Sequence, residues 1–196
     1  MNKLKMNPFV KWAGGKTQLL HKLEGYIPQT YNRYFEPFIG GGALLLDIQP
    51  QKAVINDVNG QLLNVYSQLK ADVEEVIKII NEFDSIECDK LHYLRMREEY
   101  NEKINKNILD AECAALMIWI NKHCFNGLYR VNSKGLLNVP YNQKINGRSI
   151  NEENLRNISY YLNSYEIEIR KGDFETACID VQDGDFVYFD SPYIPV

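Results

Sequence analysis

The pattern that most limits the possible fold is a strand, a glycine turn and a helix near the N-terminus. An apolar, strand-like run at 34–39 enters Gly40-Gly41-Gly42, and an apolar helical segment follows directly. A second short strand at 53–55 ends at Asn56-Asp57, before another helical segment. Strands that alternate with helices pair in parallel through right-handed crossovers. This pattern predicts an α/β fold with a parallel sheet.

The rest of the chain changes rhythm and then returns to strands. Three helices are predicted at 72–83, 87–104 and 110–122, followed by a hairpin at 125–141 and a further helix at 151–163. Two strands are then predicted at 166–170 and 186–189. In the hairpin segment, Tyr129 and Val131 alternate around Arg130 as in a hairpin arm. The order predicts a sheet interrupted by a mostly helical lobe that carries a basic hairpin.

Composition narrows the class of protein. With 45% hydrophobic and 24% charged residues, the chain is typical of globular domains. No apolar run approaches the ~20 residues of a membrane helix, and the first residues lack the apolar core of a signal peptide. We therefore expect a cytoplasmic protein without membrane contact. The four cysteines are far apart and form no CxxC pair, which indicates reduced thiols and no metal site.

Charge is distributed unevenly, although the net charge is only −4. The first acidic residue, Glu24, comes after five lysines. No acidic residue lies between Glu112 and Glu152, a stretch that contains Lys122, Arg130, Lys134, Lys144 and Arg148. Two positive zones on an acidic body can bind a polyanion locally. An ordinary solvated surface explains either zone alone.

The glycine turn favours a nucleoside-type cofactor. Without Cβ atoms, its backbone can approach a ligand closely, and the helix that follows adds partial positive charge. Asp57 suits two neighbouring ribose hydroxyls at the end of the next strand. The alternative is a tight connection with no ligand. NAD is disfavoured because the turn reads GGGALL rather than G-x-G-x-x-G, and a nucleoside triphosphate because Val10 replaces the first glycine of a phosphate loop.

Six motifs together resemble the Dam-type DNA adenine methyltransferases, α-class enzymes that mostly recognise GATC. In chain order they are PFVKWAGGKTQLL, FEPFIGGGALLLDI, INDVN, FNGLYRVNSKGLLNVPY, GDF and YFDSPYIPV. The resemblance implies a Rossmann-like, S-adenosylmethionine-dependent methyltransferase sheet formed by residues 1–70 and 164–196. It also implies an inserted, mostly helical target-recognition lobe at 71–163, with the hairpin at 125–141. In the family the sheet continues beyond the last motif, so the sheet here is expected to be truncated at its C-terminal end.

The resemblance assigns the cofactor site by position. Trp12 and Lys16 match the segment that closes over S-adenosylmethionine, with Lys16 near the cofactor's carboxylate. The other matches are Phe38, Gly40 and Gly42 in the glycine turn, Asp57 at the ribose, Asp173 and Phe174 beside the adenine, and Asp190 at the reacting end.

The catalytic tetrapeptide implied by the resemblance is Asp190-Ser191-Pro192-Tyr193, which stands where the family has Asp-Pro-Pro-Tyr. An aromatic amine is a poor nucleophile because its lone pair is delocalised into the ring. The Asp190 carboxylate and the Ser191 carbonyl can accept its two hydrogens, and Tyr193 can stack on the extruded base. Positioning and oriented dipoles then suffice, without a metal. Serine at 191 loses the fixed φ of proline, so we expect slower turnover.

The hairpin is the predicted reader of DNA sequence. By its match to the family, Arg130 binds the major-groove edge of guanine, a contact worth ~1–3 kcal/mol in discrimination. The other matches are Phe125 and Asn126 where the target base leaves the stack, Leu128 and Pro140 at a thymine methyl group, and Lys122 and Lys134 at phosphates.

These residues predict a site-specific methyltransferase for the 6-amino group of adenine in double-stranded DNA, at GATC. The alternative is a truncated or degenerate module that binds S-adenosylmethionine or DNA without catalysis. A second chain is a further expected partner, because an apolar strand at 186–189 without neighbours invites pairing. The enzymatic hypothesis requires that the glycine turn and Asp190 border one cavity.

Overall fold

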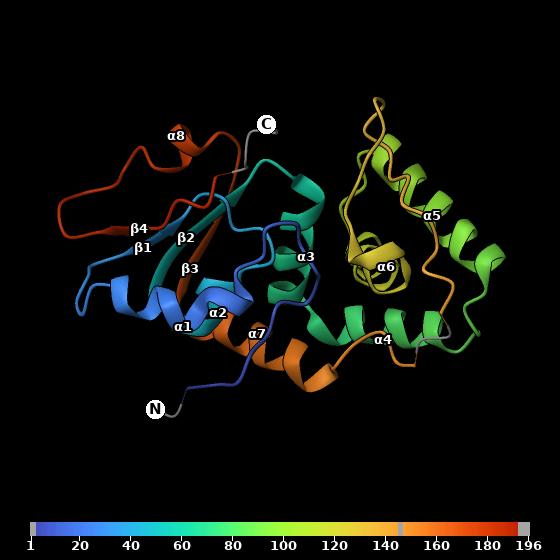
Figure 1. Ribbon diagram of the computed structural model, residues 1–196, viewed down its shortest axis with the longest axis horizontal. Coiled ribbons are helices and arrows are strands. Elements are labelled where there is room, and N and C mark those ends of the chain that lie inside the picture. The colour runs from blue at the N-terminus through green and yellow to red at the C-terminus, as the bar shows by residue number, and fades with distance from the viewer. Residues whose placement is uncertain (1–2, 145–146, 192–196) are drawn as a thin grey trace.

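The computed structural model describes residues 3–144 and 147–191, which form an α/β structure (Figure 1). All strand pairings in the four-stranded sheet are parallel, in the order β3-β2-β1-β4. The strands are β1 (Tyr34–Glu36), β2 (Lys52–Asp57), β3 (Glu166–Lys171) and β4 (Phe186–Val187). The predicted fold class, an α/β fold with a parallel sheet, is confirmed.

Two strands are shorter than their apolar runs. Strand β1 ends at Glu36 because Pro37 has no N–H to donate, and the chain then enters the glycine turn. Strand β4 pairs only with β1, in a register that joins Tyr34 to Phe186. Among the described residues, no strand lies on the outer side of β4. The predicted apolar edge is therefore present, although it is two residues long.

Helices fill the predicted helical segments, with ends shifted by a few residues, and the short helix α8 was not predicted. They are α1 (Leu20–Leu23), α2 (Ala43–Ile48), α3 (Gly60–Ala71), α4 (Val73–Asp84), α5 (Lys90–Asn105), α6 (Ala111–His123), α7 (Glu152–Ser164) and α8 (Phe174–Ala177). Short 3-10 helices lie at Thr17–Leu19, Glu24–Tyr26 and Phe125–Gly127. Helices α3 to α7 each begin after an Asn or Asp whose side chain accepts backbone N–H groups, which satisfies the free donors of the first turn.

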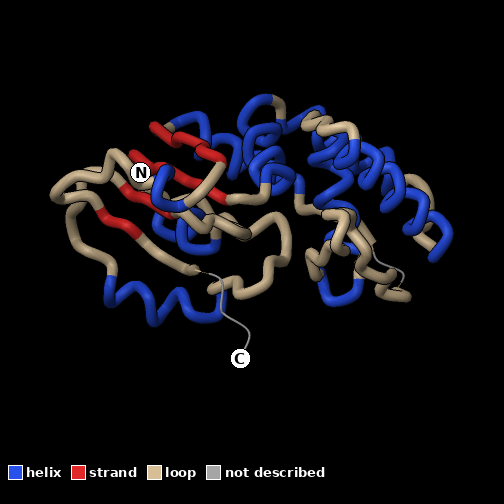
Figure 2. The backbone as a smooth tube through the Cα atoms, turned by 90° about the horizontal axis from the view of Figure 1, so that it is seen from above, coloured by secondary structure: helices blue, strands red, loops and turns tan. Residues whose placement is uncertain are grey.

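Helix α6 forms the centre of the helical part of the molecule. Its apolar segment is buried all round, and it packs against α3, α4 and α5. Trp119, at its middle, is fully buried. Figures 1 and 2 show the strands gathered on one side of the molecule and these long helices on the other. The burial of α6 fixes its C-terminal end, from which the hairpin segment departs.

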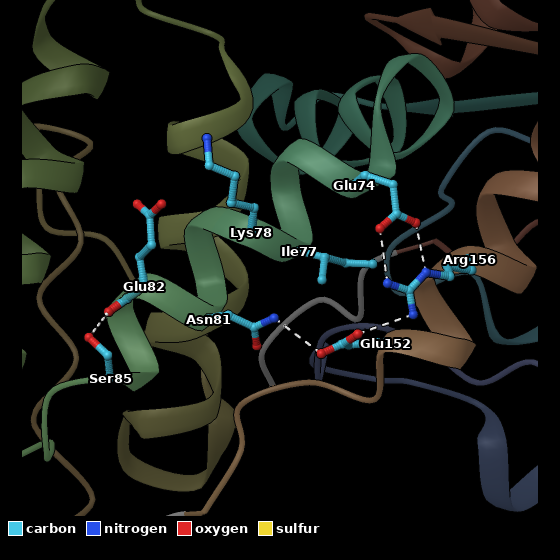
Figure 3. Close-up of a pocket in the computed structure, with 8 residues that line it drawn as sticks. All are labelled: Glu74, Ile77, Lys78, Asn81, Glu82, Ser85, Glu152 and Arg156. Atoms are coloured by element: carbon cyan, nitrogen blue, oxygen red, sulfur yellow. Dashed lines mark hydrogen bonds and ion pairs between the residues drawn. The ribbon is translucent and has the colours of Figure 1, made fainter.

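Helix α7 joins the two sides. It contacts α3 and β3 as well as α4. A surface groove between α4 and α7 is crossed by charged pairs (Figure 3). Arg156 binds both carboxylate oxygens of Glu74, at 2.7 and 2.9 Å, and Asn81 donates to Glu152. Because these groups satisfy one another, the groove serves as an anchoring contact between helices.

The hairpin at 125–141 follows an antiparallel path without regular strands. Its arms form two isolated β-bridges, Cys124 with Tyr141 and Val131 with Leu137. All four cysteines are free thiols. Within 3–144 and 147–191, no helix has the length and apolar character for a bilayer crossing, and no group of His, Cys, Asp or Glu side chains is arranged to hold a metal ion.

Candidate active site

One large cleft, of about 1640 Å³, contains the glycine turn and Asp190 together. Its walls are the N-terminal segment, the ends of β1 and β2, the residues after β4, and the start of the hairpin segment. The required geometry, a cavity shared by Gly40–Gly42 and Asp190, is therefore confirmed. The carboxyl ends of parallel strands meet at one sheet edge, which is where ligands bind in open α/β sheets.

The glycine turn is held from two sides. Gly40 and Gly42 have φ values of 49° and 69°, in the left-handed region that favours glycine. A Cβ on Gly40 would lie 2.8 Å from Trp12 Cδ1, and one on Gly42 would collide with Tyr66 Oη. The Tyr66 hydroxyl also donates to the Gly40 carbonyl at 3.0 Å. Trp12 therefore covers the turn while Tyr66 supports it.

Asp57 lies at the end of β2 and is hydrogen-bonded to the turn. Its Oδ2 accepts from the Gly40 N–H at 3.1 Å, and its Oδ1 accepts from the Asn59 N–H at 2.9 Å. Burial raises the pKa of the Asp57 carboxyl, and these backbone donors oppose that rise. The carboxylate is thus oriented along the cleft wall, beside the turn.

Lys16 and Asp190 form the main ion pair of the cleft. The Lys16 ammonium lies 2.6 Å from each carboxylate oxygen of Asp190 and also donates to the Gly14 carbonyl. Their side chains are 13% and 24% exposed, so water screens the pair only partly. Ser191 lines the same cleft and is exposed. Pro192 and Tyr193, the rest of the predicted tetrapeptide, lie outside the described residues.

Glu36 is a buried acid of the cleft, and the sequence motifs assigned no role to it. It is 3% exposed at the end of β1, and Tyr34 donates its hydroxyl proton to Glu36 Oε2 at 2.7 Å. Burial, with a contribution from the charge of Asp190, raises the pKa of Glu36 to about 8. The only available signal was an acidic residue inside an otherwise apolar run.

Three phenylalanine rings lie together beside the cleft. Phe38 lines it, with the Phe174 ring 5.5 Å and the Phe189 ring 6.4 Å away between centroids. Phe174 does not line the cleft directly. Asp173 is exposed, and its side chain accepts from the Glu175 N–H at the start of α8. Phe189 was not among the predicted residues.

The predicted DNA-binding residues all lie on the surface. Lys122, Phe125 and Asn126 line the cleft, whereas the other four do not. The full exposed set is Lys122, Phe125, Asn126, Leu128, Arg130, Lys134 and Pro140. The hairpin therefore begins at the cleft rim and extends away from it.

Side chains at every fourth residue of α5 hold the hairpin in place. Tyr93 and Arg97 both donate to the Val139 carbonyl at 2.8 Å. Asn101 donates to the Leu137 carbonyl and accepts from its N–H. The three residues share one helix face because their spacing is four. The spacing of four can be seen in the sequence, but the segment that this helix face contacts cannot.

Arg130 is already oriented by its neighbours. Its Nε donates to Asn138 Oδ1 at 2.9 Å, and its Nη2 donates to the Asn138 carbonyl at 3.1 Å. These bonds connect the two arms of the hairpin. The exposed guanidinium is thus held by Asn138 on the opposite arm.

Comparisons with known proteins identify the family of this chain. The model for D12 class N6 adenine-specific DNA methyltransferases matches residues 12–196. The chain is 46% identical over 195 residues to Type II methyltransferase M1.LlaDCHI of Lactococcus lactis subsp. cremoris, which covers 100% of this chain and 68% of that protein. It is 40% identical over 209 residues to Type II methyltransferase M.MjaIII of Methanocaldococcus jannaschii, covering 98% and 71%.

A Dam relative is more distant. The chain is 27% identical over 200 residues to the DNA adenine methylase of Escherichia coli K12, covering 98% of this chain and 66% of that protein. The family model and the two Type II relatives confirm the resemblance at the level of the enzyme class. The chain belongs to the D12 class of N6 adenine-specific DNA methyltransferases.

Proposed function

We propose that this chain transfers a methyl group from S-adenosylmethionine to the 6-amino group of adenine in double-stranded DNA, at GATC sites. The observation that carries the proposal is the single cleft that contains the glycine turn, the Asp57 carboxylate and Asp190. The exposed hairpin begins at the rim of that cleft, where DNA would approach.

The residues present fit an adenosyl cofactor with an amino-acid tail. Asp57 is placed for the ribose hydroxyls, Phe38 for the adenine, and Lys16 for the tail carboxylate. Trp12, Gly40 and Gly42 shape the wall between them, and Asp173 and Phe174 remain candidates for the outer rim. When bound, S-adenosylmethionine supplies an electrophilic methyl group on a sulfonium.

Asp190 and Ser191 orient the adenine amino group in this proposal. The Asp190 carboxylate accepts a hydrogen bond from one amino N–H and the Ser191 carbonyl from the other, which directs the nitrogen lone pair toward the methyl group. As the nitrogen–carbon bond forms, the carbon–sulfur bond would break, and the amino group would lose one proton to water. Asp190 is bound to Lys16 in the structure. Lys16 therefore has to move toward the tail carboxylate when the site fills. Restoring proline by Ser191→Pro should raise turnover a few-fold.

We further propose that residues 71–163 act as the target-recognition lobe. Arg130 reads guanine, and Lys122 and Lys134 contact phosphates. Leu128 and Pro140 contact a thymine methyl group, and Phe125 and Asn126 border the gap left by the extruded base. The GATC assignment rests on the match of the hairpin motif to the Dam-type enzymes.

A second chain is the remaining proposed partner. The outer side of β4 carries no strand among the described residues, and the Phe189 side chain beside it is 54% exposed. Unpaired strand edges favour pairing with another polypeptide. A change from dimer to monomer on Phe189→Lys substitution, measured by light scattering, would support this pairing.

Transfer of labelled methyl groups to duplex DNA tests the proposed function. A GATC duplex should accept label from S-adenosylmethionine, and a duplex with the target adenine replaced should not. Serine in the catalytic tetrapeptide favours one alternative, a module that binds without catalysis. Binding of S-adenosylhomocysteine without any methyl transfer would support that alternative and contradict the proposal.

A further inference from the structure

One indole ring lies between the glycine turn and the hairpin. The Trp12 ring stacks on Tyr129, with centroids 5.0 Å apart and planes at 28°. The same ring also lies against Gly40, where an added Cβ would be 2.8 Å from Trp12 Cδ1. Tyr129 stands between Leu128 and Arg130 in the hairpin sequence. A single aromatic stack thus connects the proposed cofactor wall to the proposed DNA reader.

A second contact joins the same two segments. Asn121, buried near the end of α6, accepts from the Lys11 N–H at 2.8 Å and donates to the Lys11 carbonyl at 3.0 Å. It also donates to the Gly127 carbonyl at 2.9 Å. A Cβ on Gly127 would lie 2.6 Å from Lys11 Cδ, so the Gly127 backbone packs closely against the Lys11 side chain. These contacts link the start of the hairpin to the segment that carries Trp12.

We propose that Tyr129 is a positioning residue that couples DNA binding by the hairpin to the closure of Trp12 over the cofactor. This inference rests on the proposed function. Tyr129 needs no contact with either ligand, because it acts through the indole ring. When DNA orders the hairpin, Tyr129 holds Trp12 against the glycine turn, and a bound cofactor favours the same arrangement.

The size of the effect follows from the strength of aromatic stacking. A stacked pair of this kind changes an equilibrium about 2- to 12-fold. Coupling between two binding sites is reciprocal, so DNA must raise cofactor affinity by the same factor as cofactor raises DNA affinity. Removal of the ring should therefore reduce both effects equally, while each ligand alone still binds.

The test compares the affinity for S-adenosylhomocysteine with and without a saturating GATC duplex. In the unsubstituted chain, the duplex should tighten binding of the product. Tyr129→Ala and Tyr129→Leu should reduce that tightening about 2- to 12-fold, while the affinity without DNA stays within about twofold. Tyr129→Phe should retain the tightening because the ring remains. Tyr160→Ala, at an exposed tyrosine of α7, is the matched control.

Tryptophan fluorescence supplies a second readout. The chain has two tryptophans, and Trp119 is fully buried in α6, so changes on DNA binding report Trp12. The change should survive Tyr129→Phe and disappear in Tyr129→Ala and Tyr129→Leu. Equal tightening in Tyr129→Ala, Tyr129→Leu and the unsubstituted chain would overturn the coupling alone. An unsubstituted chain that binds neither product nor duplex would contradict the proposed function and the coupling with it.

Discussion

The two sides of the cleft are built in different ways. On the sheet side, Gly40, Gly42 and Glu36 are buried, and Asp57 is hydrogen-bonded to backbone. On the hairpin side, the predicted DNA-binding residues are all exposed, and side chains of α5 hold the backbone. Core packing thus fixes the shape of the cofactor wall, whereas individual hydrogen bonds from α5 position the hairpin. Substitutions should therefore damage cofactor binding and stability together on the first side, and DNA binding or specificity without loss of stability on the second.

The largest effect is expected at Asp190 on the sheet side. Asp190→Ala removes the proposed acceptor of an amino hydrogen and should lower the methyl-transfer rate by about 10²- to 10³-fold. Single-turnover transfer of labelled methyl to a GATC duplex measures it. Asp183→Ala, an exposed acid outside the cleft, should change the rate less than about twofold. Equal rates for Asp190→Ala and the unsubstituted chain would rule out the catalytic assignment.

Arg130 and Lys134 test the hairpin side. Arg130→Ala should lower discrimination between GATC and a duplex with its guanine replaced by about 5- to 150-fold, since a good base contact is worth ~1–3 kcal/mol. Lys134→Ala should weaken binding to specific and random duplexes alike. Competition binding at fixed salt separates the two outcomes. Parallel losses on both duplexes for both variants would count against the hairpin as the reader.

Substitution of two glycines with left-handed backbone allows a direct comparison of the sheet side and the hairpin side of the cleft. Gly42→Ala places a Cβ against Tyr66 Oη, whereas Gly135→Ala meets nothing within 4 Å. Both changes strain the backbone, but only the first overpacks, which costs ~1–3 kcal/mol further. Gly42→Ala should therefore lower Tm by several degrees more than Gly135→Ala and weaken S-adenosylhomocysteine binding. Similar losses in calorimetry for both variants would remove the proposed contrast between packed wall and open hairpin.

The smallest expected effect concerns the buried carboxyl of Glu36. Its pKa of about 8 in the folded chain stands above the ordinary value of 4.5. Between those values the folded chain keeps a proton that the unfolded chain has lost, so stability falls as pH rises through this window. Glu36→Gln removes that fall and keeps an acceptor for Tyr34. The Tm of the variant relative to the unsubstituted chain should therefore rise as the pH increases from about 5 to about 8.5.

Glu24→Gln, at an exposed glutamate, provides the control for this pH dependence. Its Tm should follow that of the unsubstituted chain across the same range. A Tm difference for Glu36→Gln that stays constant with pH would mean that this carboxyl is ionised in the folded protein.

The local features of the fold and of the site could be predicted from the sequence. Alternating strands and helices, the glycine turn, and Asp57 at a strand end follow from short patterns, because each depends on neighbouring residues. The Lys16–Asp190 pair joins positions far apart in the chain. Only the resemblance to the family placed both residues at the cofactor site. Glu36 as a cleft residue had only a weak signal, an acidic residue inside an apolar run. The Asn121 contacts and the Tyr129 stack had none, because they depend on which distant segments pack together.

The α5 residues Tyr93, Arg97 and Asn101 show the same limit of prediction from sequence. Their spacing of four predicts a shared helix face, but no pattern states that this face meets the hairpin rather than solvent. Asp173 and Phe174 illustrate the converse. Both match a family motif, yet Asp173 caps α8 and Phe174 reaches the cleft only through Phe38.

A crystal structure with S-adenosylhomocysteine and a GATC duplex bound would test most directly whether one cleft joins cofactor and target base. We expect the adenosyl group between Phe38 and Asp57, with its sulfur facing an unstacked adenine whose amino group lies within hydrogen-bond distance of Asp190. Product bound outside this cleft, or a target adenine away from Asp190, would contradict the account.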